Sequence, residues 1–250
     1  MNIRIENLSK VFKTKEGEEL AALAGVGLTI HDQEFLVICG PSGCGKSTLL
    51  YILAGFEHAS GGTIHFEGAT PGRRPSSIIF QEYALLPWRT VLDNVAFGLE
   101  NRGVPRAQRY ERAQGFINLV GLQGFERKYP YELSGGMKQR VAIARALAND
   151  PEVLLMDEPF ASLDAQTRES LQEELLKIWE THKKTVVFVT HSIDEAVLLG
   201  DRVAVMRGRP GAILEVIEVK LPRPRDLDTK SSQPFQEYVR YIRNRIQKQI

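Results

Sequence analysis

Residues 40–48 constrain this chain more than any other stretch, because they fit the phosphate-binding pattern G-x-x-x-x-G-K-[ST]. Apolar residues 35–39 precede them as a short buried strand would, and apolar residues at helical spacing follow as far as residue 54. A strand, a glycine-rich turn and a helix start therefore follow one another, in the order that a phosphate-binding loop requires. The loop consists of Gly40, Pro41, Ser42, Gly43, Cys44, Gly45, Lys46, Ser47 and Thr48.

The chemistry of this loop predicts that the chain binds a nucleoside triphosphate. Its glycines allow the backbone to approach an anion closely, and the helix start adds unpaired N–H donors and the positive end of the helix dipole. We expect Lys46 to reach the β- and γ-phosphates and the Ser47 hydroxyl to ligate Mg²⁺. A glycine-rich turn that binds nothing would explain the glycines, but not the strand, the lysine and the serine at their fixed spacing.

Composition narrows the class of protein further. Lysine and arginine (32) nearly balance aspartate and glutamate (31), so no bulk positive charge favours a nucleic acid partner. No apolar run approaches the ~20 residues that cross a bilayer, and charged residues lie near residue 1, where a signal peptide would need an apolar core. Cys39 and Cys44 bracket the start of the loop, where a disulfide would distort it. We therefore expect a soluble protein of the reducing cytosol.

Two carboxylates and a histidine follow two further apolar runs. Residues 153–156 predict a strand buried in a parallel sheet, and Asp157 and Glu158 come directly after it. Carboxylates at such a strand end must be paired or metal-bound to offset desolvation. We expect Asp157 to act on Mg²⁺ and Glu158 to activate the attacking water, although an N-cap or salt-bridge role for Glu158 stays open. His191 follows the run 185–190 and can donate to a γ-phosphate oxygen.

Three features of the first hundred residues each allow two interpretations. Phe12 is either a core aromatic, which its spacing slightly favours, or a stacking platform for a base. Gln81, after the predicted strand 77–80, is either a surface amide or a side chain that reaches Mg²⁺ or the attacking water. Residues 82–88, which are apolar around a proline, form either a buried loop or an exposed docking patch.

The rest of the chain indicates two β-rich parts, an inserted helical part and a tail. Residues 3–8, 20–30, 63–66, 203–206 and 212–219 predict further strands, and 165–181 predicts an amphipathic helix. Residues 91–148 have a helical pattern, and their arginines at 102, 106, 109 and 112 are expected to form a solvated helix face. Within this part, Ser134, Gly135 and Gly136 open a helix, as either an anion site or a plain serine N-cap. Residues 221–226 predict a turn that ends the core, and the basic amphipathic stretch 235–250 is expected to pack back on the domain or on a partner rather than on a membrane surface.

The ordered set of motifs resembles one family, the ATP-binding-cassette ATPases. Residues 40–48, Gln81, 133–136, 153–158, 162–164 and His191 look like the family's Walker A, Q-loop, signature, Walker B, D-loop and switch histidine. The resemblance covers residues 1–220 and implies an α/β fold. In this fold a P-loop NTPase (RecA-like) core carries an antiparallel β-layer and an inserted α-helical subdomain at about 88–148, followed by a C-terminal tail at 221–250. Residues 80–88, 133–164 and 221–226 are also similar to the ATPase subunits of nitrate/sulfonate/taurine-type importers.

The resemblance implies a motor that works as a homodimer with two ATP molecules between its subunits. Each phosphate chain would lie between residues 40–48 of one subunit and Ser134, Gly135 and Gly136 of the other, with Asp164 nearby. Phe12 would stack on the base, and Gln81 would join Ser47 and Asp157 at Mg²⁺. Residues 81–88 would dock on separate membrane-spanning permease subunits at the cytoplasmic face of the inner membrane. A periplasmic or extracellular solute-binding protein would take part indirectly.

Two departures from the family pattern concern the signature and the D-loop. Met137 replaces the usual glutamine, which should matter little because backbone N–H groups and Ser134 bind the phosphate. Residues 161–162, Ala-Ser, are unusual before the D-loop aspartate, but Asp164 itself is kept, so activity is expected. The rival functions are a soluble ATPase of DNA repair or translation and a catalytically silent ATP-binding regulator. The absence of long coiled-coil insertions or a second cassette argues against the first rival, and the intact Lys46, Asp157, Glu158 and His191 against the second.

Overall fold

A computed structural model describes residues 1–14, 16–70 and 75–247 of the chain. Its first layer is an antiparallel sheet of strands β1 (Asn2–Lys13), β2 (Glu19–Ile30) and β4 (Gly61–Glu67) in the order β2-β1-β4. The sequence predicts this layer from alternating apolar residues, and Ile3, Ile5 and Leu8 of β1 are indeed buried between exposed or half-buried neighbours. The antiparallel β-layer expected from the sequence is therefore confirmed.

The second layer is a six-stranded sheet that carries the site. Its order is β5 (Ser76–Ile79), β6 (Val153–Asp157), β7 (Thr185–Thr190), β3 (Phe35–Cys39), β8 (Arg202–Arg207) and β9 (Ala212–Glu218). The first five strands are parallel and β9 is antiparallel to β8. Strands β3, β6 and β7 are buried throughout because both faces of the sheet are covered, which explains their continuous apolar sequences.

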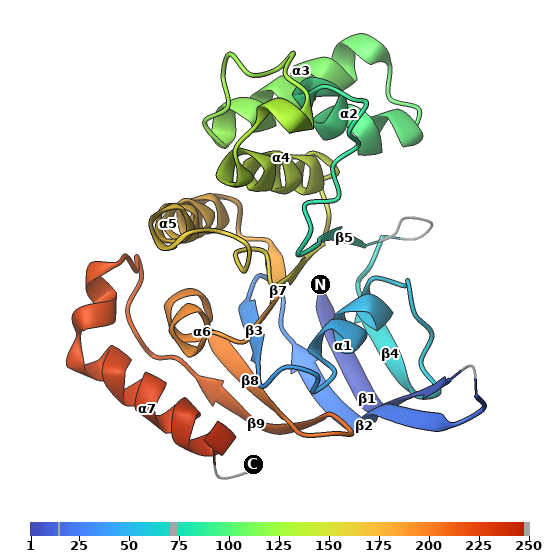
Figure 1. Ribbon diagram of the computed structural model, residues 1–250, viewed down its shortest axis with the longest axis vertical. Coiled ribbons are helices and arrows are strands. Elements are labelled where there is room, and N and C mark those ends of the chain that lie inside the picture. Colours follow the sequence, from blue (N-terminus) through green and yellow to red (C-terminus); the bar gives the residue numbers. More distant parts are fainter. Residues whose placement is uncertain (15, 71–74, 248–250) are drawn as a thin grey trace.

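Alternate side chains of these central strands enter two separate apolar cores. On one face, Leu36 and Ile38 pack with α1 (Lys46–Leu53) and with the antiparallel sheet. On the other face, Phe35 and Val37 pack with α5 (Ala165–His182) and α6 (Ile193–Leu199). In Figure 1, α1 accordingly lies between the two sheets, whereas α5 and α6 lie beyond the parallel sheet. The predicted apolar positions of α5 (Leu171, Leu175, Ile178 and Trp179) are all buried.

The inserted part consists of helices, as the sequence predicts. Helices α2 (Val91–Asn101), α3 (Arg106–Leu119) and α4 (Gly135–Ala148), with a short 3₁₀ turn at Pro130–Glu132, form the upper lobe in Figure 1. Their buried apolar residues belong to the same core as α5 and α6. One expectation is wrong here: Arg109 is not simply solvated, because its guanidinium pairs with Glu100 at 3.1 Å and is mostly buried.

The C-terminal tail packs on the domain. Helix α7 (Gln233–Gln247) follows a 3₁₀ turn at Asp228–Ser231 and buries Phe235, Val239 and Ile242 in the core of α5 and α6. This is the packing that the sequence favours over a membrane surface. Residues 248–250 of the predicted helix lie outside the described residues. No helix in the described parts of the chain is long and apolar enough to cross a membrane.

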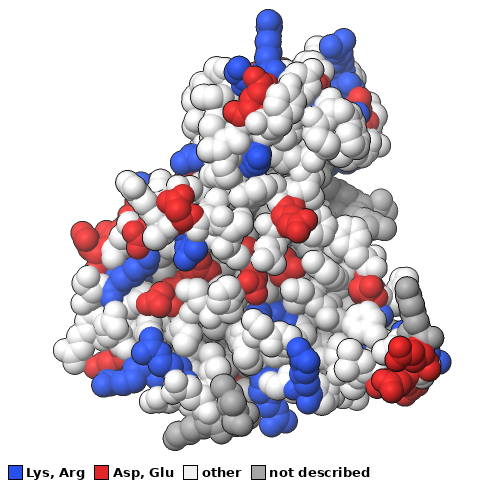
Figure 2. All heavy atoms as spheres, in the orientation of Figure 1, with Lys and Arg blue, Asp and Glu red and all other residues white. Residues whose placement is uncertain are grey.

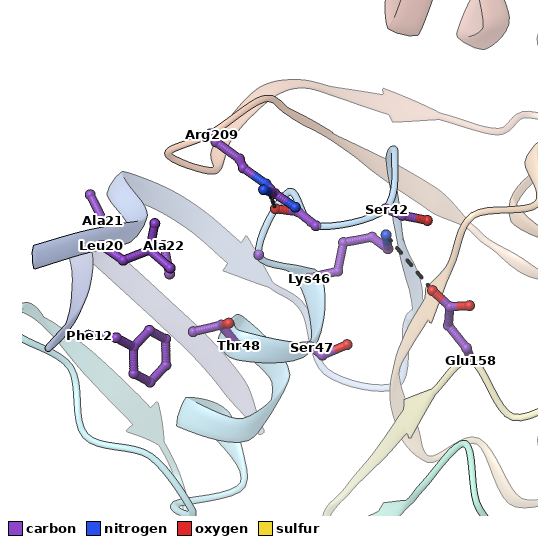
Figure 3. Close-up of a pocket in the computed structure, with 12 residues that line it drawn as sticks. Phe12, Leu20, Ala21, Ala22, Ser42, Lys46, Ser47, Thr48, Glu158 and Arg209 are labelled. Carbon is purple, nitrogen blue, oxygen red and sulfur yellow. Dashed lines mark hydrogen bonds and ion pairs between the residues drawn. The ribbon is translucent and has the colours of Figure 1, made fainter. Parts of the chain in front are cut away.

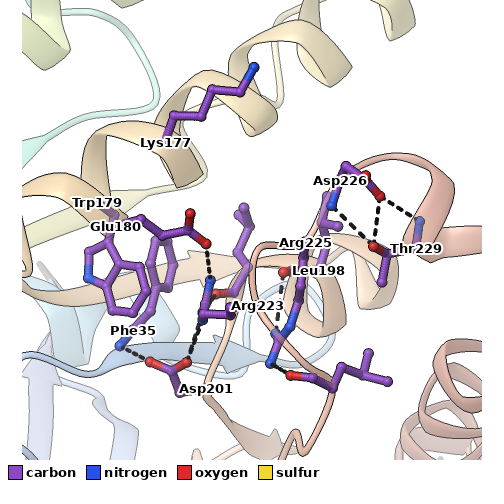
Figure 4. Close-up of polar contacts among 12 residues, drawn as sticks. Phe35, Lys177, Trp179, Glu180, Leu198, Asp201, Arg223, Arg225, Asp226 and Thr229 are labelled. Atoms are coloured by element: carbon purple, nitrogen blue, oxygen red, sulfur yellow. Dashed lines mark hydrogen bonds and ion pairs between the residues drawn. The ribbon is translucent and has the colours of Figure 1, made fainter.

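The segment before α7 is more than the turn that the sequence predicts. Arg225 is only 4% exposed and donates hydrogen bonds to carbonyl oxygens of α6, of the segment after it and of the residue that follows β9. Figure 4 shows its bond to Leu198 of α6. Beside it, Arg223 pairs with Asp201 at 2.8 Å and its guanidinium lies 4.3 Å from the ring centre of Trp179. The reason is that a buried guanidinium needs many acceptors, and the ends of α6 and β9 supply free carbonyls. Burial lowers the pKa of Arg225 to about 10, so it stays charged at neutral pH.

Candidate nucleotide-binding site

A cavity of about 360 Å³ opens beside the phosphate-binding loop (Figure 3). A volume of this size suits a small-molecule ligand. The loop and the start of α1 form one side, β1 and β2 form another, and the end of β6 and the turn between β8 and β9 complete it. The lining residues are Phe12, Leu20, Ala21, Ala22, Ser42, Gly43, Gly45, Lys46, Ser47, Thr48, Glu158 and Arg209.

The loop has the backbone geometry of an anion cradle. Gly43 and Gly45 have φ values of 77° and 90°, which glycine adopts without strain. A Cβ at Gly45 would also lie 2.8 Å from the Ala22 carbonyl oxygen, so the loop is packed against β2. Gly45 is the N-cap of α1 and no side chain caps this helix. The first N–H groups of α1 are therefore available to a ligand.

Lys46 is held over the loop by backbone acceptors. Its ammonium donates to the carbonyl oxygens of Gly40 and Pro41, each at 3.0 Å, and lies 3.9 Å from Glu158 Oε1. The side chain is only 4% exposed. The two carbonyls hold the ammonium in place without neutralising its charge, and Glu158 pairs with it only at 3.9 Å, so the ammonium can still bind an anion.

The end of β6 places a carboxylate next to the loop serine. Asp157 is 3% exposed, and its Oδ1 accepts a hydrogen bond from Ser47 Oγ at 2.8 Å. Burial raises the pKa of Asp157, and the hydrogen bonds from Ser47 and Tyr51 offset this only in part. A cation beside the carboxylate would compensate its desolvation.

These oxygens fit Mg²⁺ bound together with phosphates. Mg²⁺ usually takes one or two protein oxygens and completes its shell with substrate phosphates and water. Ser47 and Asp157 supply such a pair. Among the described residues no three His, Cys, Asp or Glu side chains group together as a metal cage.

A carboxylate and an imidazole meet where β6 and β7 end. Glu158 Oε2 lies 2.7 Å from His191 Nδ1, with Glu158 17% and His191 57% exposed. The Glu158 backbone has a φ of 43° and its N–H donates to the Val189 carbonyl oxygen at 3.0 Å. A non-glycine residue in this left-handed region costs energy and is typical of functional sites. The turn it makes carries the side chain of Glu158 towards Lys46 (Figure 3).

Ten predicted site residues do not line this cavity. Five of them adjoin it: Gly40, Pro41 and Cys44 belong to the loop, Asp157 is bonded to Ser47, and His191 contacts Glu158. The other five lie elsewhere. Gln81 is exposed and lies two residues beyond the end of β5, because the predicted strand stops at Ile79. Ser134 is the N-cap of α4 and accepts from the Met137 N–H at 3.3 Å. Asp164 is the N-cap of α5, and the hydrogen bond from the Thr167 N–H lowers its pKa. Gly135 and Gly136 begin α4.

Several residues near the starts of α4 and α5 show no motif in the sequence but are joined by hydrogen bonds. The Tyr83 hydroxyl lies 3.0 Å from Ser162 Oγ, so the segment after β5 contacts the segment before α5. A Cβ at Gly135 would lie 3.1 Å from the same hydroxyl. Arg145 of α4 donates to the carbonyl oxygens of Tyr83 and Ala84. Ser162, which departs from the usual D-loop sequence, therefore has a partner that the sequence does not reveal.

Residues 82–88 are partly buried and partly exposed. Asn94, fully buried, donates to the carbonyl oxygens of Leu86, Arg89 and Thr90 and accepts from the Leu86 N–H. Trp88 is 71% exposed, whereas Leu85 packs against the core. A second cavity of about 350 Å³ lies beside this segment. It is lined by Ala54, Phe56, Ser76, Ser77, Ile78, Phe80, Ala84, Leu86, Phe97, Gly98, Asn101, Arg145, Ala146 and Asn149.

The fold and the cavity together define a P-loop ATPase domain with an antiparallel β-layer and an inserted helical subdomain. A family model described as "ABC transporter" matches residues 23–161. The chain belongs to this family, and the resemblance predicted from the motifs is confirmed.

Curated relatives cover nearly the whole chain. It is 53% identical to an uncharacterized ABC transporter ATP-binding protein of Methanocaldococcus jannaschii, over 100% of this chain and 93% of the relative. It is 46% identical to the aliphatic sulfonates import ATP-binding protein SsuB of Bacillus cereus, over 95% of this chain and 92% of the relative. It is 47% identical to the taurine import ATP-binding protein TauB of Rhizobium johnstonii, over 88% and 85%.

Solved structures agree with the fold. The dimeric structure of a bacterial ABC transporter cassette aligns with a TM-score of 0.74 at 34% identity, over 88% of this chain and 100% of that one. A second structure of that cassette, a dimeric post-hydrolysis state bound to ADP and Pi, aligns with a TM-score of 0.73 at the same identity and coverage. The α/β cassette fold is therefore shown.

Proposed function

We propose that this chain is the ATP-hydrolysing subunit of an importer for a small solute. The observation that carries the proposal is the constellation of Lys46, Glu158 and His191 at the mouth of the phosphate-binding loop, with Glu158 within 3.9 Å of the lysine and 2.7 Å of the histidine. The importer names of two relatives supply the direction of transport and the solute class, which are sulfonates, including taurine. The proposed class of transported solutes also includes nitrate.

In this proposal the chain binds ATP by its phosphates and its base. The N–H groups of the loop and of the α1 start, together with Lys46, would hold the β- and γ-phosphates. The ring of Phe12, which lines the cavity, would stack on the base. Ser47 and Asp157 would hold Mg²⁺, which when bound neutralises phosphate charge, and Gln81 is proposed as a further ligand.

Hydrolysis would use Glu158 as the general base. A water attacks the γ-phosphorus, its proton passes to the Glu158 carboxylate, and the bond to the ADP oxygen breaks. His191 would orient this carboxylate through the 2.7 Å contact and, as an imidazolium, donate from Nε2 to a γ-phosphate oxygen. Lys46 would stabilise the charge that develops on the transferred phosphoryl group.

The homodimer would complete the site. The helix starts at Ser134 and Asp164 lie outside the cavity of their own chain. We infer that Ser134, Gly135, Gly136 and Asp164 face the phosphates bound by a second copy, as in a head-to-tail pair. The N–H groups at the start of α4 would form a second anion-binding helix end, so ATP would hold two copies together from both sides.

The permease would dock on the apolar surface beside β5. Trp88 is exposed, and Phe56, 55% exposed, stacks on Phe80 with ring centres 5.9 Å apart. Exposed aromatic residues beside a cavity of about 350 Å³ mark a site for a protein partner rather than for solvent. In our proposal a cytoplasmic segment of a separate membrane-spanning subunit fills this cavity at the cytoplasmic face of the inner membrane. A solute-binding protein would contact the permease only.

The test is to purify tagged protein from its native membranes in a gentle detergent and identify what comes with it. A stoichiometric polytopic partner, lost when Phe56 and Trp88 are both changed to serine, would support the importer. An exposed control pair on α3, Gln108→Ser and Arg112→Ser, should keep the partner. Recovery with ribosomes or DNA, in a salt-sensitive manner, would instead favour an ATPase of translation or DNA repair. On the face shown in Figure 2, basic and acidic side chains are interspersed.

A further inference from the structure

We propose that Arg209, in the turn between β8 and β9, is a further residue of the nucleotide-binding site: it clamps the phosphate-binding loop and donates to the phosphate chain of the bound nucleotide. This inference rests on the proposed binding of ATP in the cavity beside the loop. Arg209 lies 163 residues beyond Lys46 in the chain, outside the motifs of the sequence. It nevertheless lines the same cavity as Lys46 and Phe12 (Figure 3).

The guanidinium of Arg209 is in direct contact with the loop. Its Nε donates to the Gly43 carbonyl oxygen at 3.1 Å. A Cβ at Gly43 would lie 2.1 Å from Arg209 Nη2, so the guanidinium occupies the space that a side chain would need. Position 43 is free in the general phosphate-loop pattern, and the structure gives a reason for glycine there in addition to its φ of 77°.

The turn that carries Arg209 is fixed against the loop and β2. The Gly211 N–H donates to the Ala22 carbonyl oxygen at 2.9 Å, and the Ala24 N–H donates to the Gly211 carbonyl oxygen at 3.0 Å. A Cβ at Gly211 would lie 2.0 Å from the Cys44 carbonyl oxygen. The backbone beside Arg209 therefore touches both β2 and the loop, and the side chain starts from a defined place above the cavity.

No carboxylate in the part of the chain that the structure describes pairs with Arg209. None of the ion pairs among residues 1–14, 16–70 and 75–247 involves this side chain. After the bond from Nε to Gly43, the two terminal nitrogens keep four N–H donors in a planar fork, the geometry that matches phosphate oxygens. An unpaired guanidinium at the wall of a triphosphate cavity is a binding group for phosphate, and Lys46 is thus not the only cation that the nucleotide meets.

The experiment measures nucleotide binding by Arg209→Gln, Arg209→Lys and a matched control, Arg207→Gln, which removes the same charge from the exposed end of β8. Binding of ATP, ADP and adenosine is followed by calorimetry at low and at physiological salt. We expect Arg209→Gln to weaken ATP and ADP about tenfold, equal to ~1.4 kcal/mol, and to leave adenosine unchanged, because adenosine has no phosphate. Arg209→Lys should recover part of the loss, and Arg207→Gln should behave as wild type.

Steady-state kinetics give the second readout. Because the interaction exists with bound ATP before and during hydrolysis, KM for ATP should rise about tenfold in Arg209→Gln, with kcat within about twofold of wild type. Wild-type affinity for ATP in Arg209→Gln, an equal loss in Arg207→Gln, or an equal loss for adenosine would each overturn the proposal. Thermal melting verifies that the variants are folded. Two other results would contradict the proposed function instead. One is that the wild-type chain binds no ATP, and the other is that the Lys46→Ala variant binds ATP as tightly as wild type.

Discussion

Replacing Glu158 by glutamine separates binding of ATP from its hydrolysis. The glutamine carbonyl can still accept from His191 Nδ1, which lies 2.7 Å from the carboxylate, so the local geometry is kept. Its amide cannot take a proton from the attacking water. Loss of a general base costs on the order of 100-fold or more in kcat, equal to ~2.7 kcal/mol of activation free energy.

The same variant should hold ATP at least as tightly as wild type. The carboxylate lies 3.9 Å from the Lys46 ammonium, and its negative charge opposes the phosphates. Removing that charge therefore favours the ATP-bound state, and we expect a dimer in gel filtration with ATP that is absent with ADP.

The assay is release of inorganic phosphate at saturating ATP, with Glu111→Gln on the exposed face of α3 as the matched control. The control should turn over at the wild-type rate. Turnover by Glu158→Gln within threefold of wild type would refute the reasoning. A glutamine amide cannot take the proton, so Glu158 would then not be the general base.

Three further predictions concern stability and the loop. Burial raises the pKa of Asp157 above its ordinary 3.8, so the ionised carboxylate destabilises the folded state. Asp157→Asn should therefore have a higher melting temperature than wild type at pH 7.5 without nucleotide. The gain should vanish below pH 3.8, where Asp157 is protonated in both the folded and the unfolded state. The same variant should lose Mg²⁺-dependent hydrolysis. Arg225→Met orphans several buried carbonyl groups and should lower the free energy of unfolding by about 3 kcal/mol in urea titrations, whereas Arg240→Met on the exposed face of α7 should change it by less than about 0.5 kcal/mol. Gly211→Ala would bring a methyl group within 2.0 Å of a loop carbonyl oxygen and should weaken ATP binding at least tenfold, while Gly27→Ala, with no atom within 4 Å, should not.

The core of the site could be predicted because its signals are local. Residues 40–48 specify their own turn, and the strands before Asp157 and His191 are recognisable from continuous apolar runs. Parallel strands then bring their carboxyl ends to one edge of the sheet, which is why Glu158 and His191 meet although they are 33 residues apart. Phe12 also reaches the cavity, from a strand of the antiparallel layer, although its spacing alone slightly favours a core position.

The parts that the sequence does not reveal depend on which loops the sheet order brings together. Arg209 touches Gly43 because β8 lies next to β3, and no spacing rule in the sequence specifies that neighbour. The Tyr83–Ser162 contact likewise joins two irregular segments, and irregular segments carry no periodicity. Arg225 lies in a stretch that the sequence predicts only as a turn that ends the core, and the free carbonyls at the ends of α6 and β9 explain its burial.

The two bonds from Lys46 to its own loop have a consequence for how the free energy of binding is divided. Because these bonds and the tight packing of Gly45 on β2 are contacts of the chain with itself, they fix the shape of the cradle, and an arriving nucleotide does not have to order it. Ordering residues 40–48 would otherwise cost on the order of 10 kcal/mol, at roughly 1–2 kcal/mol for each residue fixed. A preorganised cradle leaves that free energy available for work elsewhere, and in the proposed motor that work is the closure of two copies around ATP.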